Sequence, residues 1–165
     1  VPHFENKNHE IKWIWPTHYH NAFPGKAARF LSEEVEHRPF LALCNHCENP
    51  PCVRACPTGS SHVSDGGTII VTQHKCSGCK VCITACPYDA RLIMHPDGYI
   101  DKCTFCHHRV EQGQDPACVS SCPTHCMYFG DINDRNSIVS QLLDARKSRA
   151  LKPETGNRPN VFYLS

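Results

Sequence analysis

The stretch Cys76–Pro87 reads CSGCKVCITACP, and the architecture we expect for the whole chain follows from it. Its spacing, C-x2-C-x2-C-x3-C-P, is the run that ligates iron–sulfur cubes in bacterial proteins. Three closely spaced thiolates on a tight loop bind three irons of one cube. The fourth cysteine follows on a short helical turn and binds a second cube. One such run therefore requires a partner run elsewhere in the chain.

Two further runs of the same kind flank it. Upstream, residues 44–57 read CNHCENPPCVRACP, which is the same pattern with two extra residues before the third cysteine. Downstream, residues 103–106 read CTFC, and residues 118–123 read CVSSCP. A threefold C-x3-C-P ending identifies an internal repeat of iron–sulfur modules.

The composition agrees with a small fold organised around metal. Of 165 residues, 13 are cysteine, 13 proline and 9 glycine. So much cysteine indicates either disulfides or bound metal, and the odd count and repeated spacing favour metal. Frequent proline and glycine limit regular structure. We therefore predict a small, loop-rich α+β fold with short hairpins and short helices around [4Fe–4S] clusters.

Two other cofactors share parts of these patterns. Zinc ribbons also use C-x2-C pairs, but triple-cysteine runs closed by C-x3-C-P fit cubes better. Residues 103–107 read CTFCH and match the c-type haem attachment motif, yet Cys118 and Cys122-Pro123 complete an iron–sulfur run there. Iron–sulfur clusters are the prediction that accounts for all three runs.

Charge and hydropathy limit the partners. Lys and Arg number 17 against 16 Asp and Glu, so nothing favours a polyanionic partner such as nucleic acid. The longest apolar runs, such as residues 68–71, are far shorter than a membrane span. We expect no transmembrane segment in this sequence, so any link to a membrane passes through another subunit.

The crossed rule for paired runs assigns two cubes. Cluster A takes Cys44, Cys47, Cys52 and Cys86. Cluster B takes Cys76, Cys79, Cys82 and Cys56. The third run, with Cys103, Cys106 and Cys118, lacks a partner: an upstream run has been lost, or Cys122 or Cys126 closes the cube, or three thiolates hold a three-iron cluster. Six basic residues adjoin the ligands and either raise cluster potentials or only solubilise the surface: Arg54, Lys75, Lys80, Arg91, Lys102 and Arg109.

The chain divides into three parts by composition. Residues 1–43 contain no cysteine and form an extension that packs on the core, with a strand over 11–15 and a helix over 24–35. Trp13 and Trp15 are packing groups, and the histidines at 3, 9, 18 and 20 are solvated rather than metal ligands. Residues 44–135 form the iron–sulfur domain, and residues 136–165 form a helix and a docking tail.

Alternation and turn residues predict the elements between and after the runs. Hairpins are expected over 61–72, turning at Asp65–Gly67, and over 91–100, turning at residues 95–98. Asn136 or Ser137 caps a helix with an apolar side, which docks on the core or on a partner. The tail from Lys152 is extended, and its end, Val161–Leu164, docks on another surface.

These motifs resemble a known family. CNHCENPPCVRACPTG (44–59), KCSGCKVCITACPYDAR (75–91), DKCTFCHHR (101–109), PACVSSCPT (116–124), FGD (129–131) and RPNVFYL (158–164) are similar to the four-cluster iron–sulfur subunits of the dimethyl sulfoxide and polysulfide reductase type. The segments EIKWIW (10–15) and HNAFPG (20–25) resemble the periplasmic iron–sulfur subunit of the sulfite-reductase-linked membrane complex of sulfur-metabolising microbes.

The resemblance implies tandem ferredoxin-like modules and a function without catalytic side chains. Such subunits relay electrons between a quinone-reactive integral membrane subunit and a catalytic or cytochrome subunit in anaerobic respiration, at the periplasmic or outer face of the membrane. The rival interpretation is an iron–sulfur enzyme or sensor with an incompletely ligated cluster.

The resemblance also bears on the cluster count. The family opens with a further cysteine run just before a Val-Pro pair, and this sequence starts at Val1-Pro2. That run is therefore absent, or lies on residues not present here. Its last cysteine would complete the cube of Cys103, Cys106 and Cys118, and its first three would share a cube with Cys122. We expect two clusters, three if the third run is closed, and four with the upstream run.

Overall fold

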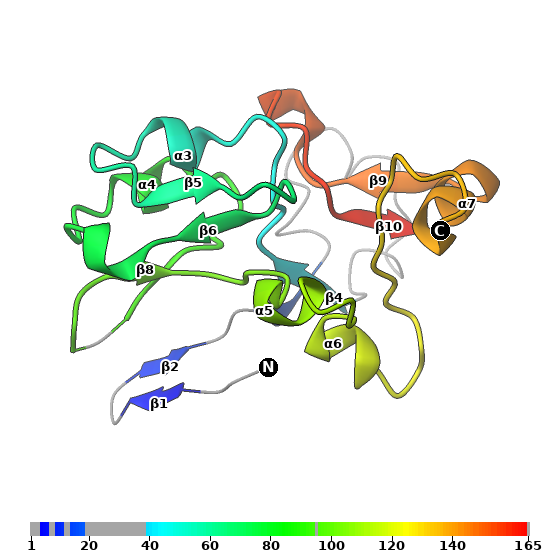
Figure 1. Cartoon of the computed structure of the whole chain (residues 1–165), viewed down its shortest axis with the longest axis horizontal. Coiled ribbons are helices and arrows are strands. Elements are labelled where there is room, and N and C mark those ends of the chain that lie inside the picture. Colours follow the sequence, from blue (N-terminus) through cyan, green and yellow to red (C-terminus); the bar gives the residue numbers. More distant parts are fainter. Residues whose placement is uncertain (1–3, 7–8, 12–13, 19–38, 95, 165) are drawn as a thin grey trace.

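The computed structural model describes residues 4–6, 9–11, 14–18, 39–94 and 96–164. Within these ranges the chain forms short hairpins and short helices joined by irregular connections (Figure 1). Frequent prolines and glycines interrupt regular structure, which explains why the elements stay short. The predicted fold class is confirmed in its coarse form, a small mixed α/β chain with few helices and short strands.

The described strands pair two by two as antiparallel ribbons. The pairs are β1 (Phe4–Asn6) with β2 (His9–Ile11), β3 (Ile14–His18) with β4 (Pro39–Leu43), β5 (Ser61–Val63) with β6 (Ile69–Val71), β7 (Leu92–Ile93) with β8 (Ile100–Asp101), and β9 (Ser148–Ala150) with β10 (Phe162–Leu164). Both hairpins predicted from alternation are confirmed. Two-stranded ribbons are marginally stable alone, so each depends on what it packs against.

Short helices recur at one place in every cysteine run. The third cysteine of each run is the second residue of a helix: α3 (Pro51–Arg54), α4 (Val81–Thr84) and α6 (Ala117–Ser120). The proline that follows each fourth cysteine cannot continue the helix, because it lacks an N–H group. The third run also contains α5 (His107–Val110), directly after Cys106. The repeat inferred from spacing therefore extends to secondary structure.

The predicted C-terminal helix is α7 (Ile138–Ala145), and its cap is Ser137. The backbone N–H of Ser140 donates to Ser137 Oγ at 3.1 Å, which satisfies a free donor of the first turn. Ile138 remains 49% exposed, so the helix does not bury its whole apolar side within the described chain.

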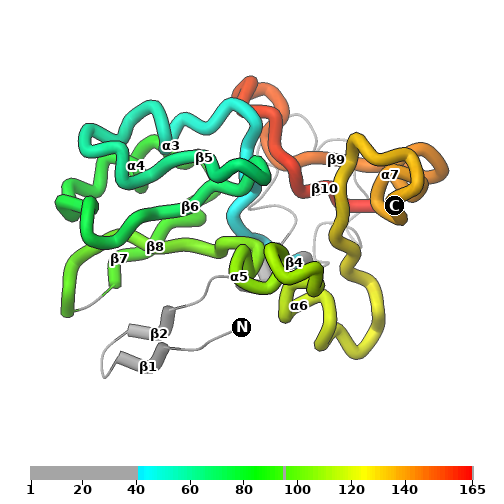
Figure 2. The backbone as a smooth tube through the Cα atoms, viewed as in Figure 1, coloured from blue at the N-terminus to red at the C-terminus, as the bar shows by residue number. Residues whose placement is uncertain are grey.

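The C-terminal tail folds back onto the first cysteine run (Figure 2). Backbone bonds join Glu48 N–H to Arg158 O at 2.9 Å, Asn49 N–H to Asn157 O at 3.1 Å, and Asn160 N–H to Asn45 O at 2.9 Å. The tail is not extended throughout: Pro153–Thr155 form a 3-10 turn, because Lys152 and Gly156 on either side adopt left-handed backbone. Its end pairs as β10 with β9, so the docking partner of residues 162–164 lies within this chain.

Two small apolar cores lie side by side, and each contains cysteines. The first consists of Leu43, Cys44, Cys47, Tyr88, Ala90, Cys103 and Leu151. The second consists of Cys52, Ile69, Cys82 and Ile100. Ile69 and Ile100, each 1% exposed, bring the hairpins β5–β6 and β7–β8 into the second core. Hairpins thus cover the cysteine loops, as expected for sulfur kept away from water.

Several predictions for the first 43 residues fall outside the described part. The helix over 24–35, Trp13, and the histidines at 3 and 20 lie there. Of the strand expected over 11–15, Ile11 ends β2 and Ile14 begins β3, with residues 12–13 outside the described ranges.

Candidate iron–sulfur centres

The three runs share a backbone geometry that secondary structure alone does not reveal. The third residue of each C-x2-C loop has left-handed backbone: His46 (φ 41°), Gly78 (φ 66°) and Phe105 (φ 53°). The third residue after each closing cysteine does so too: Gly59 (φ 66°), Asp89 (φ 52°) and His125 (φ 48°). Left-handed residues inside tight turns let successive N–H groups converge on an anion. Each run therefore folds as a cradle for a negatively charged group.

At Gly78 the loop requires glycine for a second reason. A Cβ at this position would lie 2.8 Å from the backbone oxygen of Gly98, in the turn between β7 and β8. Glycine allows the C-x2-C loop of the second run to approach this turn closely. The hairpin thereby fixes the loop that carries Cys76 and Cys79.

The structure gathers the four cysteines predicted for cluster A. Cys44, Cys47 and Cys52 are buried, and Cys86 packs against the same apolar core as Cys44 and Cys47. Burial, followed by the neighbouring Cys44, Cys52 and Cys86, raises the pKa of the Cys47 thiol to about 12, while a hydrogen bond with Tyr88 acts in the opposite direction. Three buried sulfurs and a half-buried one, whose negative charges disfavour one another, would be stabilised by a cation among them.

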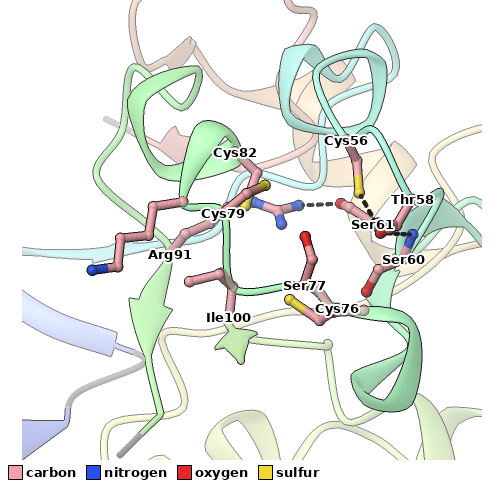
Figure 3. A pocket seen from close by; sticks show the side chains of 12 residues that line it. Cys56, Thr58, Ser60, Ser61, Cys76, Ser77, Cys79, Cys82, Arg91 and Ile100 are labelled. Atoms are coloured by element: carbon pink, nitrogen blue, oxygen red, sulfur yellow. Dashed lines mark hydrogen bonds between the residues drawn. The ribbon is translucent and has the colours of Figure 1, made fainter. Parts of the chain in front are cut away.

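The four cysteines predicted for cluster B line one small hollow (Figure 3). The wall consists of Cys56, Thr58, Ser60, Ser61, Val71, Cys76, Ser77, Cys79, Lys80, Cys82, Arg91 and Ile100. Cys82 is buried and Cys79 is exposed, so this hollow reaches the surface on the side of Cys79. It contains three cysteines of the second run together with Cys56 of the first run.

Cys56 is held by hydrogen bonds that favour a charged sulfur. The backbone N–H of Ser61 donates to Cys56 Sγ at 3.4 Å, and Thr58 Oγ1 lies 3.6 Å from the same sulfur (Figure 3). Burial tends to raise the pKa of the Cys56 thiol, but these hydrogen bonds outweigh it, so the pKa lies below its usual value. A thiolate is the form that binds iron.

In the third run, Cys103, Cys106 and Cys118 lie together. Burial raises the pKa of Cys103 to about 12, with Cys44 and Cys118 among the further causes. Burial also raises the pKa of Cys118, with Cys106 as the second cause. The backbone N–H of Ala117 donates to Cys106 Sγ at 3.4 Å. This group adjoins cluster A through Cys44.

Cys122 and Cys126 form a separate, outlying pair. Their sulfurs lie 3.7 Å apart, and Thr124 Oγ1 donates to Cys126 Sγ at 3.1 Å. The Thr124 side chain, whose Oγ1 lies 3.5 Å from Cys122 Sγ, and the backbone N–H of Cys126 lower the pKa of the Cys122 thiol to about 6. The structure therefore places the two candidate closing ligands of the third cube next to each other.

Comparison with known proteins decides the family. The model of the 4Fe–4S dicluster domain matches residues 35–132, more than half of the chain. The protein belongs to the 4Fe–4S dicluster family. The matched residues include the first two runs entire, together with the cysteines of the third. The prediction that [4Fe–4S] clusters are the cofactors is thereby confirmed.

Relatives of this 4Fe–4S dicluster protein are iron–sulfur and related subunits of reductases. A tetrathionate reductase subunit of Salmonella typhimurium is 46% identical over 135 residues, covering 81% of this chain and 54% of the relative. A polysulfide reductase subunit of Wolinella succinogenes is 41% identical, covering 73% and 64%. The arsenate respiratory reductase iron–sulfur subunit of a Shewanella species is 32% identical, covering 79% and 76%. The predicted resemblance to subunits of the polysulfide reductase type is confirmed, and the chain spans little more than half of the tetrathionate reductase subunit.

The residues present fit a 4Fe–4S dicluster domain. Each of the two cysteine groups offers four thiols, the ligand number of a cube. The cradles of backbone N–H groups suit its negative charge. Among the described residues, no helix has the length and apolar character needed to cross a bilayer.

The sequence pattern did not predict that two polar residues of the dicluster domain, His46 and Lys102, are buried and hold the fold together. His46, 1% exposed, accepts at Nδ1 from the Ile69 N–H at 3.1 Å and stacks on Phe105 with ring centroids 3.7 Å apart. Lys102, also 1% exposed, donates from Nζ to Ile69 O and to Cys103 O at 2.8 Å. Burial and then Lys102 keep the pKa of His46 well below its usual value. The one sequence feature that could have indicated their burial is their position, inside a C-x2-C loop for His46 and directly before one for Lys102.

Proposed function

We propose that this chain is an electron-transfer subunit that relays electrons through [4Fe–4S] clusters. Its partners would be a quinone-reactive membrane subunit and a catalytic or cytochrome subunit of a membrane-bound respiratory complex. The observation that carries the proposal is that cysteines of the first two runs lie side by side: Cys86 packs against Cys44 and Cys47, and Cys56 lines the same hollow as Cys76, Cys79 and Cys82. Two adjacent cubes provide a path along which an electron moves without protein chemistry.

The proposed ligation follows the crossed rule. Cluster A is held by Cys44, Cys47, Cys52 and Cys86. Cluster B is held by Cys76, Cys79, Cys82 and Cys56. The mutual effects of the cluster A thiols and the shared hollow of the cluster B thiols support this assignment. The group of Cys103, Cys106 and Cys118 is proposed as part of a third cube, with Cys122 or Cys126, or a run outside this sequence, as the source of its fourth ligand.

The organisation in three parts is proposed with it. Residues 44–135 form tandem ferredoxin-like modules, residues 1–43 an extension on the core, and residues 136–165 a C-terminal helix and tail. The recurrence of one helix and two left-handed positions in each run supports the tandem modules. We assign no catalytic side chain, and we place the chain at the periplasmic or outer face of the membrane, as a peripheral subunit.

Anaerobic purification followed by a potentiometric EPR titration tests the proposal. The expected sample is brown, contains at least eight irons and eight acid-labile sulfides per chain, and shows reduced cubes whose spins interact because they are adjacent. It should pass electrons from dithionite to an artificial acceptor without chemically converting a substrate. A colourless or zinc-loaded sample would overturn cluster binding. Turnover of a substrate by the chain alone would favour the iron–sulfur enzyme instead.

A further inference from the structure

Arg91 is a buried cation between the two cysteine groups. Its side chain is 4% exposed, and Nη2 donates to Ser61 Oγ at 2.6 Å (Figure 3). Within the described part of the chain, its Nε and Nη1 groups are buried without a hydrogen-bond partner. Guanidinium nitrogens rarely remain unpaired in a protein interior, because removing them from water without compensation is costly.

Sulfur ligands predicted for both cubes lie near this guanidinium: Arg91 lines the same hollow as Cys82, and Cys52 packs in one apolar core with Cys82. Burial works against the charge of Arg91, but neighbouring Cys52, then Cys82 and Cys44, outweigh burial and raise its pKa. Cys52 belongs to cluster A and Cys82 to cluster B. The nearby carboxylate, Asp101, accepts the backbone N–H of Lys102 at 2.8 Å, and burial raises its own pKa. Sulfur, rather than carboxylate, is therefore the main negative partner of Arg91.

We infer that Arg91 is a counter-ion shared by clusters A and B, with its free N–H groups offered to sulfur ligands on both sides. This inference rests on the proposed function and deepens it. Arg91 lines the hollow that contains Cys82, Cys52 packs beside Cys82, and the hydrogen bond to Ser61 holds the guanidinium there. It acts on the cubes through their ligands and is a positioning and tuning residue, not a catalytic one.

The shared position predicts how the cubes respond to its charge. When a cube is reduced, one electron from the reductant adds one negative charge, and no proton need follow because Arg91 is already protonated. A fixed positive charge at short range in a poorly screened interior stabilises the reduced form more than the oxidised form. Arg91 therefore raises the midpoint potentials of both clusters and makes each easier to reduce.

Arg91→Gln in the full, cluster-loaded chain is the direct test. Both midpoint potentials should fall, with the ratio of reduced to oxidised cube at a fixed potential decreasing at least tenfold, about 59 mV for one electron. Arg91→Lys keeps the charge and should recover part of the shift. Arg54→Gln is the matched control: Arg54 is exposed, lies two residues before Cys56, and donates to Asn49 Oδ1, so both potentials should stay at wild-type values.

Potentials equal to wild type in a fully loaded Arg91→Gln chain would overturn the inference. A shift confined to one cube would overturn the shared role. If Arg91→Gln loses its iron, Ser61→Ala provides the measurement, since it releases the guanidinium from its hydrogen bond without removing a charge. Unchanged potentials in a fully loaded Ser61→Ala chain would also contradict the inference. Failure of the proposed function looks different, because the wild-type chain itself would then show no cubes.

Discussion

Hydrogen bonds from single side chains to a ligand sulfur are expected to change the potential of one cube and not of the other. Cys56, a predicted ligand of cluster B, receives the Ser61 N–H and contacts the Thr58 hydroxyl. Once Cys56 binds iron its sulfur carries no proton, so the hydroxyl becomes the donor. In Thr58→Val we expect the potential of cluster B to fall by on the order of tens of mV, because a donor that stabilises the reduced cube is lost. Potentiometric EPR measures this potential, and the potential of cluster A should stay at its wild-type value.

The third run supplies a matched control for this prediction. Thr124 Oγ1 lies 3.5 Å from Cys122 Sγ in the same local turn, but outside clusters A and B. Thr124→Val should leave both of their potentials unchanged, and Thr58→Ser should restore that of cluster B. Equal shifts in the potentials of clusters A and B in Thr58→Val would show that the hydroxyl acts through the fold rather than through Cys56.

At the same scale, the sequence predicts candidate ligands but not the buried residues around them. Cysteine spacing predicts which thiols meet because each run folds locally and the C-x3-C-P ending turns the last cysteine away. The burial of Lys102 and His46 depends instead on Ile69, which is distant in sequence and contacts both. Nothing in the local pattern separates Arg91, buried between the cysteine groups, from the exposed Arg54.

Among the elements, the C-terminal tail has the most specific predicted role, as a clamp on the loop of cluster A. Asn160 Nδ2 donates to His46 O at 2.8 Å, and the Tyr163 hydroxyl donates to Leu41 O at 2.7 Å. Asn160→Ala removes one such bond, worth about 1 kcal/mol, so the loop should open about fivefold more often. The EPR signal of cluster A should decay about fivefold faster in air, while that of cluster B keeps its wild-type rate.

Asn133→Ala is the control for the clamp. Asn133 is exposed, and its backbone N–H, not its side chain, donates the hydrogen bond to Asp131. Both signals should therefore decay at the wild-type rate. Equal loss of clusters A and B in Asn160→Ala would argue for general destabilisation instead.

The local sequence pattern predicts those helices and strands whose pairing or capping partner lies close in sequence. The hairpins β5–β6 and β7–β8 follow from alternation and a turn, and α7 follows from its Ser137 cap. The pairing of β9 with β10, and the seat of the tail on residues 41–49, involve contacts between distant residues. The apolar pattern of the tail predicts that it packs on another surface, but it does not predict which residues form that surface.

For the whole molecule, the central claim is that neighbouring runs exchange ligands to hold two adjacent cubes. The third group, Cys103, Cys106 and Cys118, lies against cluster A through Cys44, so any further cube would continue the path from that side. The proposed role of Arg91, whose charge interacts with Cys52 and Cys82, would couple the two cubes electrostatically. These relations extend beyond any single run and follow from the way the runs pack together.

The EPR spectra of Cys56→Ala and Cys86→Ala, with iron and sulfide counts for each, test the claim most directly. Cys56 is the last cysteine of the first run but is assigned to cluster B, and Cys86 is the last cysteine of the second run but is assigned to cluster A. Cys56→Ala should therefore lose or alter the cluster B signal and spare cluster A, and Cys86→Ala should do the reverse. Damage in each variant to the cube of its own run would contradict the exchange of ligands.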